Sequence, residues 1–276
     1  MMQDKVAAPA GSTSAEVLLS EMRGRVLLLT LNRPAQRNSL SEALIDALQR
    51  AIDTASADPA VAAVVIASQG PAFSSGHDLK EMTARRQDAD GGRAYFAHLM
   101  DHCARMMLSI VRSPKPFIAA VEGVASAAGC QLVATCDLAL AGSAARFTTP
   151  GVNIGLFCST PMVALSRNVS RKRAMEILLL GEMLEAEAAA DYGLVNRVVP
   201  QGQALDAALA MAGIVASKSP ATVAIGKETF YRQIEMPVEQ AYVEAASVMV
   251  RNMMYRDAEE GIGAFIEKRA PVWKGW

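Results

Sequence analysis

The sequence predicts an α/β fold followed by a helical C-terminal region. Short apolar runs typical of buried strands, at residues 26–31, 61–67 and 117–121, alternate with longer segments of helical periodicity. This alternation is typical of a sheet with helices on its outer side. After Thr160 the helical patterns dominate, so the second part of the chain is predicted to be mostly helical.

The strands and helices before Thr160 are predicted from periodicity and from turn residues. Residues 17–19 and 26–31, separated by Arg23 and Gly24, predict a hairpin. Ser39 and Glu42 form a capping-box pattern before a helix that ends near Asp58. A helix over residues 93–111 and strands over residues 61–67, 117–121 and 138–141 complete this half.

The second part begins with three helical segments, at residues 161–168, 171–180 and 185–192, and a short strand at residues 195–199. From Gln203 onward we expect four helices, because the pattern is interrupted at residues 219–220, at residues 236–237 and near Asp257.

Composition restricts the classes of protein to consider. The chain has 276 residues, 51% of them hydrophobic, which is enough to bury a sizeable core. A formal net charge of −1 argues against a nucleic-acid partner. The four cysteines lack paired metal-ligand spacing, which predicts reduced thiols and a cytoplasmic location. Residues 1–15 are small and polar, so we expect a disordered tail with no signal peptide and no membrane span.

Two turns carry the pattern of an oxyanion site. In residues 118–137, an apolar run turns at Gly123 and passes through small residues into a helix start, where free N–H groups favour negative charge. Close helix–sheet packing is the alternative interpretation of those small residues. A second strand-to-loop turn, in residues 73–82, follows the apolar run at 61–67. Two such turns, each offering one amide, predict an oxyanion hole.

Six stretches of the chain, in order, resemble the crotonase (enoyl-CoA hydratase/isomerase) superfamily, and within it the enoyl-CoA hydratase domain-containing subgroup. They extend over nearly the whole chain from about Glu16: LTLNRPAQRNSL, AFSSGHDLKEM, PFIAAVEGVASAAGCQLVATCDLALA, ARFTTPGVNIGL, LLLGEMLEAEAAADYGLVNRVVP and AFIEKR. The resemblance implies a spiral of ββα units over residues 16–200. It also implies a helical trimerisation region over residues 201–276.

The resemblance also implies a site for the carbonyl of a CoA thioester. The backbone N–H groups of His77 and Ala128 match the family's two oxyanion donors. Gln131 and Gly151 match the two catalytic glutamates of its hydratases, and Ser159 matches a carboxylate used by its dienoyl-CoA isomerases. Cys158 lies beside Ser159. Gln131, Gly151 and Ser159 all lack a carboxylate, so standard hydratase activity is expected to be weak.

The His77 side chain has two open interpretations: it acts as an acid or base, or it only caps its loop near Asp78. Motifs with His at this position also occur in CoA-dependent decarboxylases of the family. The resemblance assigns the CoA moiety to a further set of residues: Gln36, Arg37, Ser75, Gly76, His77, Asp78, Leu79, Lys80, Phe265 and Lys268.

Three functional hypotheses remain open. The first is an enoyl-CoA hydratase or isomerase acting through a thioester enolate in fatty-acid or acyl-CoA metabolism. The second is a CoA-thioester decarboxylase or thioesterase, and the third is a non-catalytic acyl-CoA-binding protein. We expect an acyl-CoA or enoyl-CoA partner, a homotrimer or homohexamer, no permanently bound cofactor, and no nucleic acid or membrane. His98 and His102 have the i, i+4 spacing of metal ligands but no evident third ligand, which favours a surface or interface pair.

Overall fold

The structure, a computed structural model, describes residues 16–276, and the tail predicted for residues 1–15 lies outside this range. Its larger sheet has six strands in the order β1-β2-β3-β5-β7-β10. β1 runs antiparallel to β2, and all the other neighbours are parallel. The bounds are β1 (Leu18–Arg23), β2 (Val26–Leu31), β3 (Ala63–Ser68), β5 (Phe117–Val121), β7 (Leu138–Gly142) and β10 (Arg197–Val199).

A second sheet consists of very short strands in the order β4-β6-β8-β9. β4, β6 and β8 are parallel, and β9 is antiparallel to β8. These strands were absent from the sequence prediction, which placed a turn or a helix start at β6. Their bounds are β4 (Ala72–Ser74), β6 (Val124–Ser126), β8 (Arg146–Thr148) and β9 (Leu184–Glu185).

In the described part of the chain, seven α-helices connect these strands. The predictions at residues 161–168 and 171–180 are confirmed at both ends, whereas the short helix α2 was not predicted. The helices are α1 (Glu42–Ala57), α2 (Leu79–Ala84), α3 (Arg93–Arg112), α4 (Ala128–Thr135), α5 (Pro161–Asn168), α6 (Arg171–Leu180) and α7 (Ala186–Asp191).

The capping box predicted at the start of α1 is wrong. The N-cap residue is Ser41, whose Oγ accepts a hydrogen bond from the Leu44 amide at 3.3 Å. Ser39 lies before the helix and donates its hydroxyl to Asp78 instead. A tertiary partner therefore takes the side chain that local spacing assigned to the helix end.

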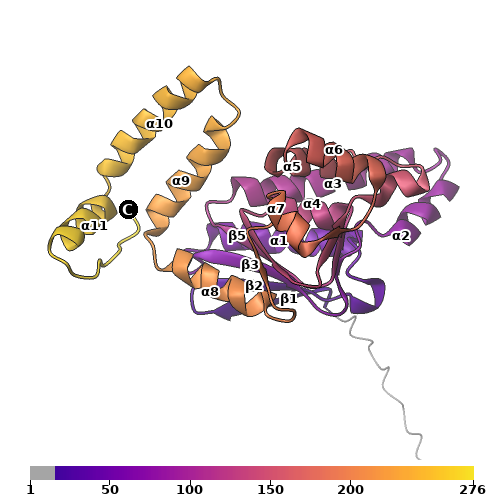
Figure 1. The fold of residues 1–276 in the computed structure, drawn as a ribbon, viewed down its shortest axis with the longest axis horizontal. Helices are drawn as coiled ribbons and strands as arrows, with labels where there is room; N and C mark the ends of the chain where they lie inside the picture. The colour runs from indigo at the N-terminus through magenta and orange to yellow at the C-terminus, as the bar shows by residue number, and fades with distance from the viewer. Residues whose placement is uncertain (1–15) are drawn as a thin grey trace, which may run out of the picture.

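The central strands β3 and β5 of the six-stranded sheet are buried on both faces, which explains their continuous apolar runs. In β3, Val64 and Ile66 pack into the main core, whereas Val65 belongs to a second cluster on the opposite face. Helix α8 (Ala204–Ala216) covers that opposite face through Ala208 and Ala212 (Figure 1). The structure thus packs α8, which the sequence prediction grouped with the oligomerisation helices, against the sheet.

The last three helices form a C-terminal arm: α9 (Pro220–Gln233), α10 (Val238–Met253) and α11 (Arg256–Ile266). The arm projects from the body on the side away from α2 (Figure 1). Lys227 anchors it, because its Nζ lies 2.7 Å from Asp137 Oδ2 and also donates to two backbone carbonyls. Within residues 16–276 no single helix is long and apolar enough to span a membrane, although α8 and α9, bent by 106°, reach that length and composition as a pair.

Candidate functional site

Three loops that carry predicted site residues leave the second sheet at the same edge. The loop after β4 holds His77, the turn after β6 leads directly into Ala128, and the segment after β8 holds Gly151. β4 pairs with β6 and β6 with β8, both in parallel. Carboxyl ends of parallel strands meet at one edge of a sheet, where ligands bind in many α/β proteins. The short strands therefore bring together residues that are far apart in the sequence.

The first two loops touch through backbone atoms. A Cβ atom placed on Gly76 would lie 2.9 Å from the Ala127 Cβ and 3.3 Å from the Ala128 nitrogen. Gly76 has a φ of +89°, a conformation that glycine adopts without strain. Ala127 has φ 49° and ψ −117°, a sparsely populated region for alanine. Such strain at the start of α4 is typical of functional turns.

Both predicted donor amides are free. Neither the His77 nor the Ala128 amide has a protein acceptor within hydrogen-bond distance in residues 16–276. Ala128 is the first residue of α4, where an N–H group has no partner inside the helix. The arrangement supplies two unpaired donors on adjacent loops, as an oxyanion site requires.

The His77 imidazole is held uncharged. Burial lowers the pKa of His77 from 6.5 to about 4. Its Nε2 is buried and has no hydrogen-bond partner among the described residues. At neutral pH the side chain is therefore a neutral imidazole, which has no excess proton to donate as an acid.

Gln131 lies one helical turn after Ala128, on the same face of α4. Its side chain is only 5% exposed, and its Oε1 has no partner among the described residues. A buried amide oxygen without a partner is costly, so this oxygen is available to a water or a ligand.

Gly151 and Cys158 form a third, tightly packed part of the site. A Cβ atom on Gly151 would lie 2.9 Å from Cys158 Sγ and 2.9 Å from the Leu156 carbonyl oxygen. Burial raises the pKa of the Cys158 thiol above its usual value. Burial, with a smaller contribution from nearby Cys158, raises the pKa of Cys130 to about 12. Ser159 is exposed and donates its hydroxyl to the Phe157 carbonyl at 3.3 Å.

Comparison with known proteins identifies the family. The family described as enoyl-CoA hydratase/isomerase matches residues 21–276. The chain belongs to the enoyl-CoA hydratase/isomerase family. It is 44% identical over 268 residues to the mitochondrial enoyl-CoA hydratase domain-containing protein 3 of Rattus norvegicus. The match covers 97% of this chain and 88% of the relative. The subgroup suggested by the sequence is thus confirmed.

Solved structures of the enoyl-CoA hydratase/isomerase family confirm the crotonase fold. An enoyl-CoA hydratase from Mycobacterium smegmatis is 51% identical, with a TM-score of 0.88 over 93% of this chain and 98% of that one. Human enoyl-CoA hydratase domain-containing protein 3 is 42% identical, also with a TM-score of 0.88, over 93% of this chain and 100% of that one.

In this member of the enoyl-CoA hydratase/isomerase family, most N–H groups of the loop assigned to CoA are already paired. The amide of Ser75 donates to Arg37 O at 3.0 Å, and that of Gly76 to Ser74 Oγ at 3.3 Å. The Lys80 amide donates to the Asp78 carboxylate at 3.1 Å. The exceptions are the His77 amide described above and the Leu79 amide at the start of α2, which has no acceptor among the described residues. Leu79 and Lys80 expose their side chains at the start of α2.

The other residues that the family resemblance assigned to CoA lie in two places. Gln36 and Arg37 are exposed on the segment before α1, where the Arg37 carbonyl contacts the site loop. Phe265, which is 83% exposed, and Lys268 lie on the C-terminal arm, apart from the site within one chain (Figure 1).

The His98 and His102 pair packs against the carboxylates of α1. His102 Nε2 lies 3.2 Å from Asp46 Oδ1, and His98 Nε2 lies 3.9 Å from Glu42 Oε1. Among residues 16–276, no group of three His, Cys, Asp or Glu side chains is arranged to hold a metal ion.

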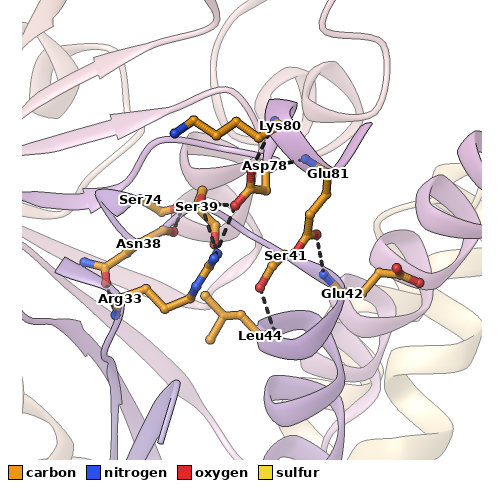
Figure 2. Close-up of polar contacts among 10 residues, drawn as sticks. All are labelled: Arg33, Asn38, Ser39, Ser41, Glu42, Leu44, Ser74, Asp78, Lys80 and Glu81. Atoms are coloured by element: carbon orange, nitrogen blue, oxygen red, sulfur yellow. Dashed lines mark hydrogen bonds and ion pairs between the residues drawn. The ribbon is translucent and has the colours of Figure 1, made fainter. Parts of the chain in front are cut away.

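Sequence reasoning missed a polar network beside the site. Asp78 caps α2 and accepts hydrogen bonds from Ser39 Oγ and from the Arg33 guanidinium (Figure 2). Burial alone would raise the pKa of Asp78, but the hydrogen bonds from Ser39, Arg33 and the amides of Glu81 and Lys80 together lower it. Asp78 and Glu81 have the spacing of a helix start, which is a local signal for α2. No local pattern indicates Arg33 as the partner.

Proposed function

We propose that the protein binds CoA thioesters with the thioester oxygen between the amides of His77 and Ala128. Two unpaired donors on touching loops are the observation that carries this proposal. Donors placed where negative charge develops stabilise an enolate, and loss of one such donor costs about 3 kcal/mol of transition-state stabilisation. The substrate class agrees with the name of the Mycobacterium smegmatis relative, an enoyl-CoA hydratase. Coenzyme A enters as part of the substrate.

The general acid and base of a family hydratase have no counterpart in this site. Gln131 orients a water but accepts no proton at neutral pH, and Gly151 has no side chain. Cys158 is a protonated thiol, and the His77 imidazole is a weak base. Since each general acid–base group contributes about 10²–10⁴-fold, hydration of an enoyl-CoA is expected to be slow.

Decarboxylation of a 2-carboxyacyl-CoA, in which the carboxylate is bonded to the α-carbon of the thioester, is the second candidate function. Loss of CO₂ leaves its bonding electron pair on the α-carbon, which forms the thioester enolate without a base removing a proton. A site with two oxyanion donors and no carboxylate at Gln131, Gly151 or Ser159 suits that chemistry.

We also propose that the C-terminal arm builds a homotrimer or a dimer of trimers. Large apolar side chains lie exposed along it without cover, as expected of an interface. In such an assembly Phe265 and Lys268 reach the CoA site of a neighbouring copy. The large exposed apolar residues of α9, α10 and α11 are Phe230, Ile234, Val238, Tyr242, Val243, Met249, Val250, Met253, Met254, Ile262, Phe265 and Ile266.

A panel of acyl-CoAs tests the proposed function. Crotonyl-CoA, a 2-carboxyacyl-CoA and a saturated acyl-CoA are each assayed for binding and for hydration, CO₂ release or release of free CoA thiol. We expect all three thioesters to bind, with free CoA binding more weakly. Equal affinity for CoA and its thioesters would contradict the oxyanion site, because the carbonyl would then contribute nothing.

A further inference from the structure

The segment before α1 is hydrogen-bonded to the loop that carries the His77 amide, and these contacts of residues 39–40 with residues 76–78 are called the clamp. The Leu40 amide donates to Gly76 O at 2.8 Å, and the Asp78 amide donates to Leu40 O at 3.3 Å. Leu40 and His77 thus form a parallel bridge in which the flanking residues of the loop supply the bonds. The N–H group of His77 points away from Leu40 as a result, and this leaves it free.

The carboxylate of Asp78 holds the segment before α1 against this loop through hydrogen bonds. Asp78 Oδ2 accepts from Ser39 Oγ at 2.9 Å and from Arg33 Nη2 at 3.2 Å (Figure 2). Asp78 Oδ1 accepts from the amides of Lys80 and Glu81, at 3.1 and 3.5 Å. The carboxylate therefore ties the segment before α1 to the first turn of α2, one residue after the donor amide.

Arg33 donates hydrogen bonds to both Ser39 and Asp78. Its Nη1 donates to the Ser39 carbonyl at 2.6 Å and to Ser39 Oγ at 3.0 Å. The side chains of Arg33 and Asp78 are 17% and 12% exposed, so solvent screens the pair less than it screens a surface ion pair. Hydrogen bonds between charged groups are stronger than neutral ones.

We propose that Arg33, Ser39 and Asp78 are positioning residues for the His77 amide. This proposal rests on the proposed function, because it concerns one of the two donors of that site. An oxyanion donor acts only when it stands 2.7–3.1 Å from the developing charge, so a small shift of the loop weakens it. The network acts on the backbone next to the donor and does not touch the thioester.

Two serines on the same segment provide a matched comparison. Ser39→Ala removes a bond to Asp78, whereas Ser41→Ala removes the cap of α1 and leaves the clamp intact. Arg33→Lys and Asp78→Ala test the other two members. Ser41→Ala is expected to lower the melting temperature without moving the site loop.

The position of the donor is measured by NMR. The chain has only three histidines, so selective ¹⁵N-histidine labelling yields three backbone amide signals, assigned with His98→Gln and His102→Gln variants. The ligand is butyryl-CoA with ¹³C at the thioester carbonyl, a saturated probe that cannot be hydrated. A polarised carbonyl gives a downfield ¹³C shift on binding. Dissociation constants are measured by calorimetry on the same samples.

In the free protein, we expect the His77 amide signal to move in Ser39→Ala, Arg33→Lys and Asp78→Ala, and to stay in place in Ser41→Ala. With butyryl-CoA, the first three variants should show a smaller carbonyl shift, and Asp78→Ala should bind about 10-fold more weakly. Folded Ser39→Ala and Arg33→Lys proteins with an unmoved His77 amide and a full carbonyl shift would overturn the positioning role. A wild-type protein without any carbonyl shift would instead overturn the proposed function, and the amide signals of the free variants would still decide the positioning role.

Discussion

Gly76 approaches Ala128 so closely that a Cβ atom on the glycine would stand 3.3 Å from the alanine nitrogen. Gly76 follows β4 and Ala128 follows β6 as the first residue of α4, and the contact joins the loops of the two free amides. The strained Ala127 backbone and the positive φ of Gly76 accompany this approach. The geometry of the oxyanion site therefore depends on backbone conformations as well as on side chains.

The strain at Ala127 predicts a stabilising substitution. Ala127→Gly should raise the free energy of unfolding by about 1 kcal/mol, because glycine adopts φ 49° without steric cost, although it loses more entropy on folding. Urea denaturation measures this value. Ala125→Gly, in β6, is the control and should destabilise the protein. Equal losses in both variants would show that Ala127 stores no strain.

The lowered pKa of His77 predicts a pH dependence of stability. The unfolded chain takes up a proton near pH 6.5, whereas folded His77 takes it up only near pH 4. The free energy of unfolding should therefore fall by about 3 kcal/mol as the pH drops from 6.5 to 4. Above pH 6.5, His77 should contribute no pH dependence to this free energy. Unfolding of wild type, His77→Gln and the exposed-site control His98→Gln is compared at pH 7.5 and 5. The prediction fails if His77→Gln loses as much stability as wild type.

The missing carboxylates predict slow hydration. Wild-type turnover of crotonyl-CoA should lie well below the ~10 s⁻¹ of a typical enzyme, and Gln131→Glu should raise it. Gly151→Glu should destabilise the fold by about 1–3 kcal/mol, because its Cβ would meet the Leu156 carbonyl at 2.9 Å. Circular dichroism accompanies the assay of enoyl absorbance. Fast wild-type hydration would show that another group supplies the acid and base.

The exposed apolar surface of the C-terminal arm predicts an oligomer. Light scattering at micromolar concentration should give three or six chain masses. Val243→Glu, at a residue that is 74% exposed, should shift the population toward smaller species. Glu239→Gln, near the start of the same helix, is the control and should leave the assembly intact. A stable wild-type monomer would contradict the interface.

Much of the larger sheet and of the helical part was predictable from local signals. The run at residues 117–121 is a strand at the predicted bounds, because apolar residues on both faces of a buried strand form a continuous pattern. Proline at residues 220 and 237 indicated the starts of α9 and α10 for a local steric reason. The turn before α4 was predicted for a similar reason, since small residues after a strand indicate a close approach, whereas His77 and Ala128 were assigned as donors by the family resemblance.

The second sheet and the clamp were not predictable in this way. β6 has only three residues, and it is a strand because β4 and β8 pair with it from other parts of the chain. Ser39 has the spacing of a helix cap, yet it bonds to Asp78, 39 residues later. Both features depend on partners distant in sequence, and no local pattern encodes such a choice.

The ¹³C shift of the butyryl-CoA carbonyl, compared between two glycine variants, tests the oxyanion site most directly. Gly76→Ala and Gly24→Ala both place alanine at a positive φ, but only Gly76→Ala adds a Cβ against Ala127 and the Ala128 nitrogen, whereas Gly24 faces open space. We predict a downfield carbonyl shift in wild type and in Gly24→Ala, and its loss in a folded Gly76→Ala protein. A full shift in folded Gly76→Ala, or no shift in wild type, would contradict the placement of the thioester oxygen between the His77 and Ala128 amides.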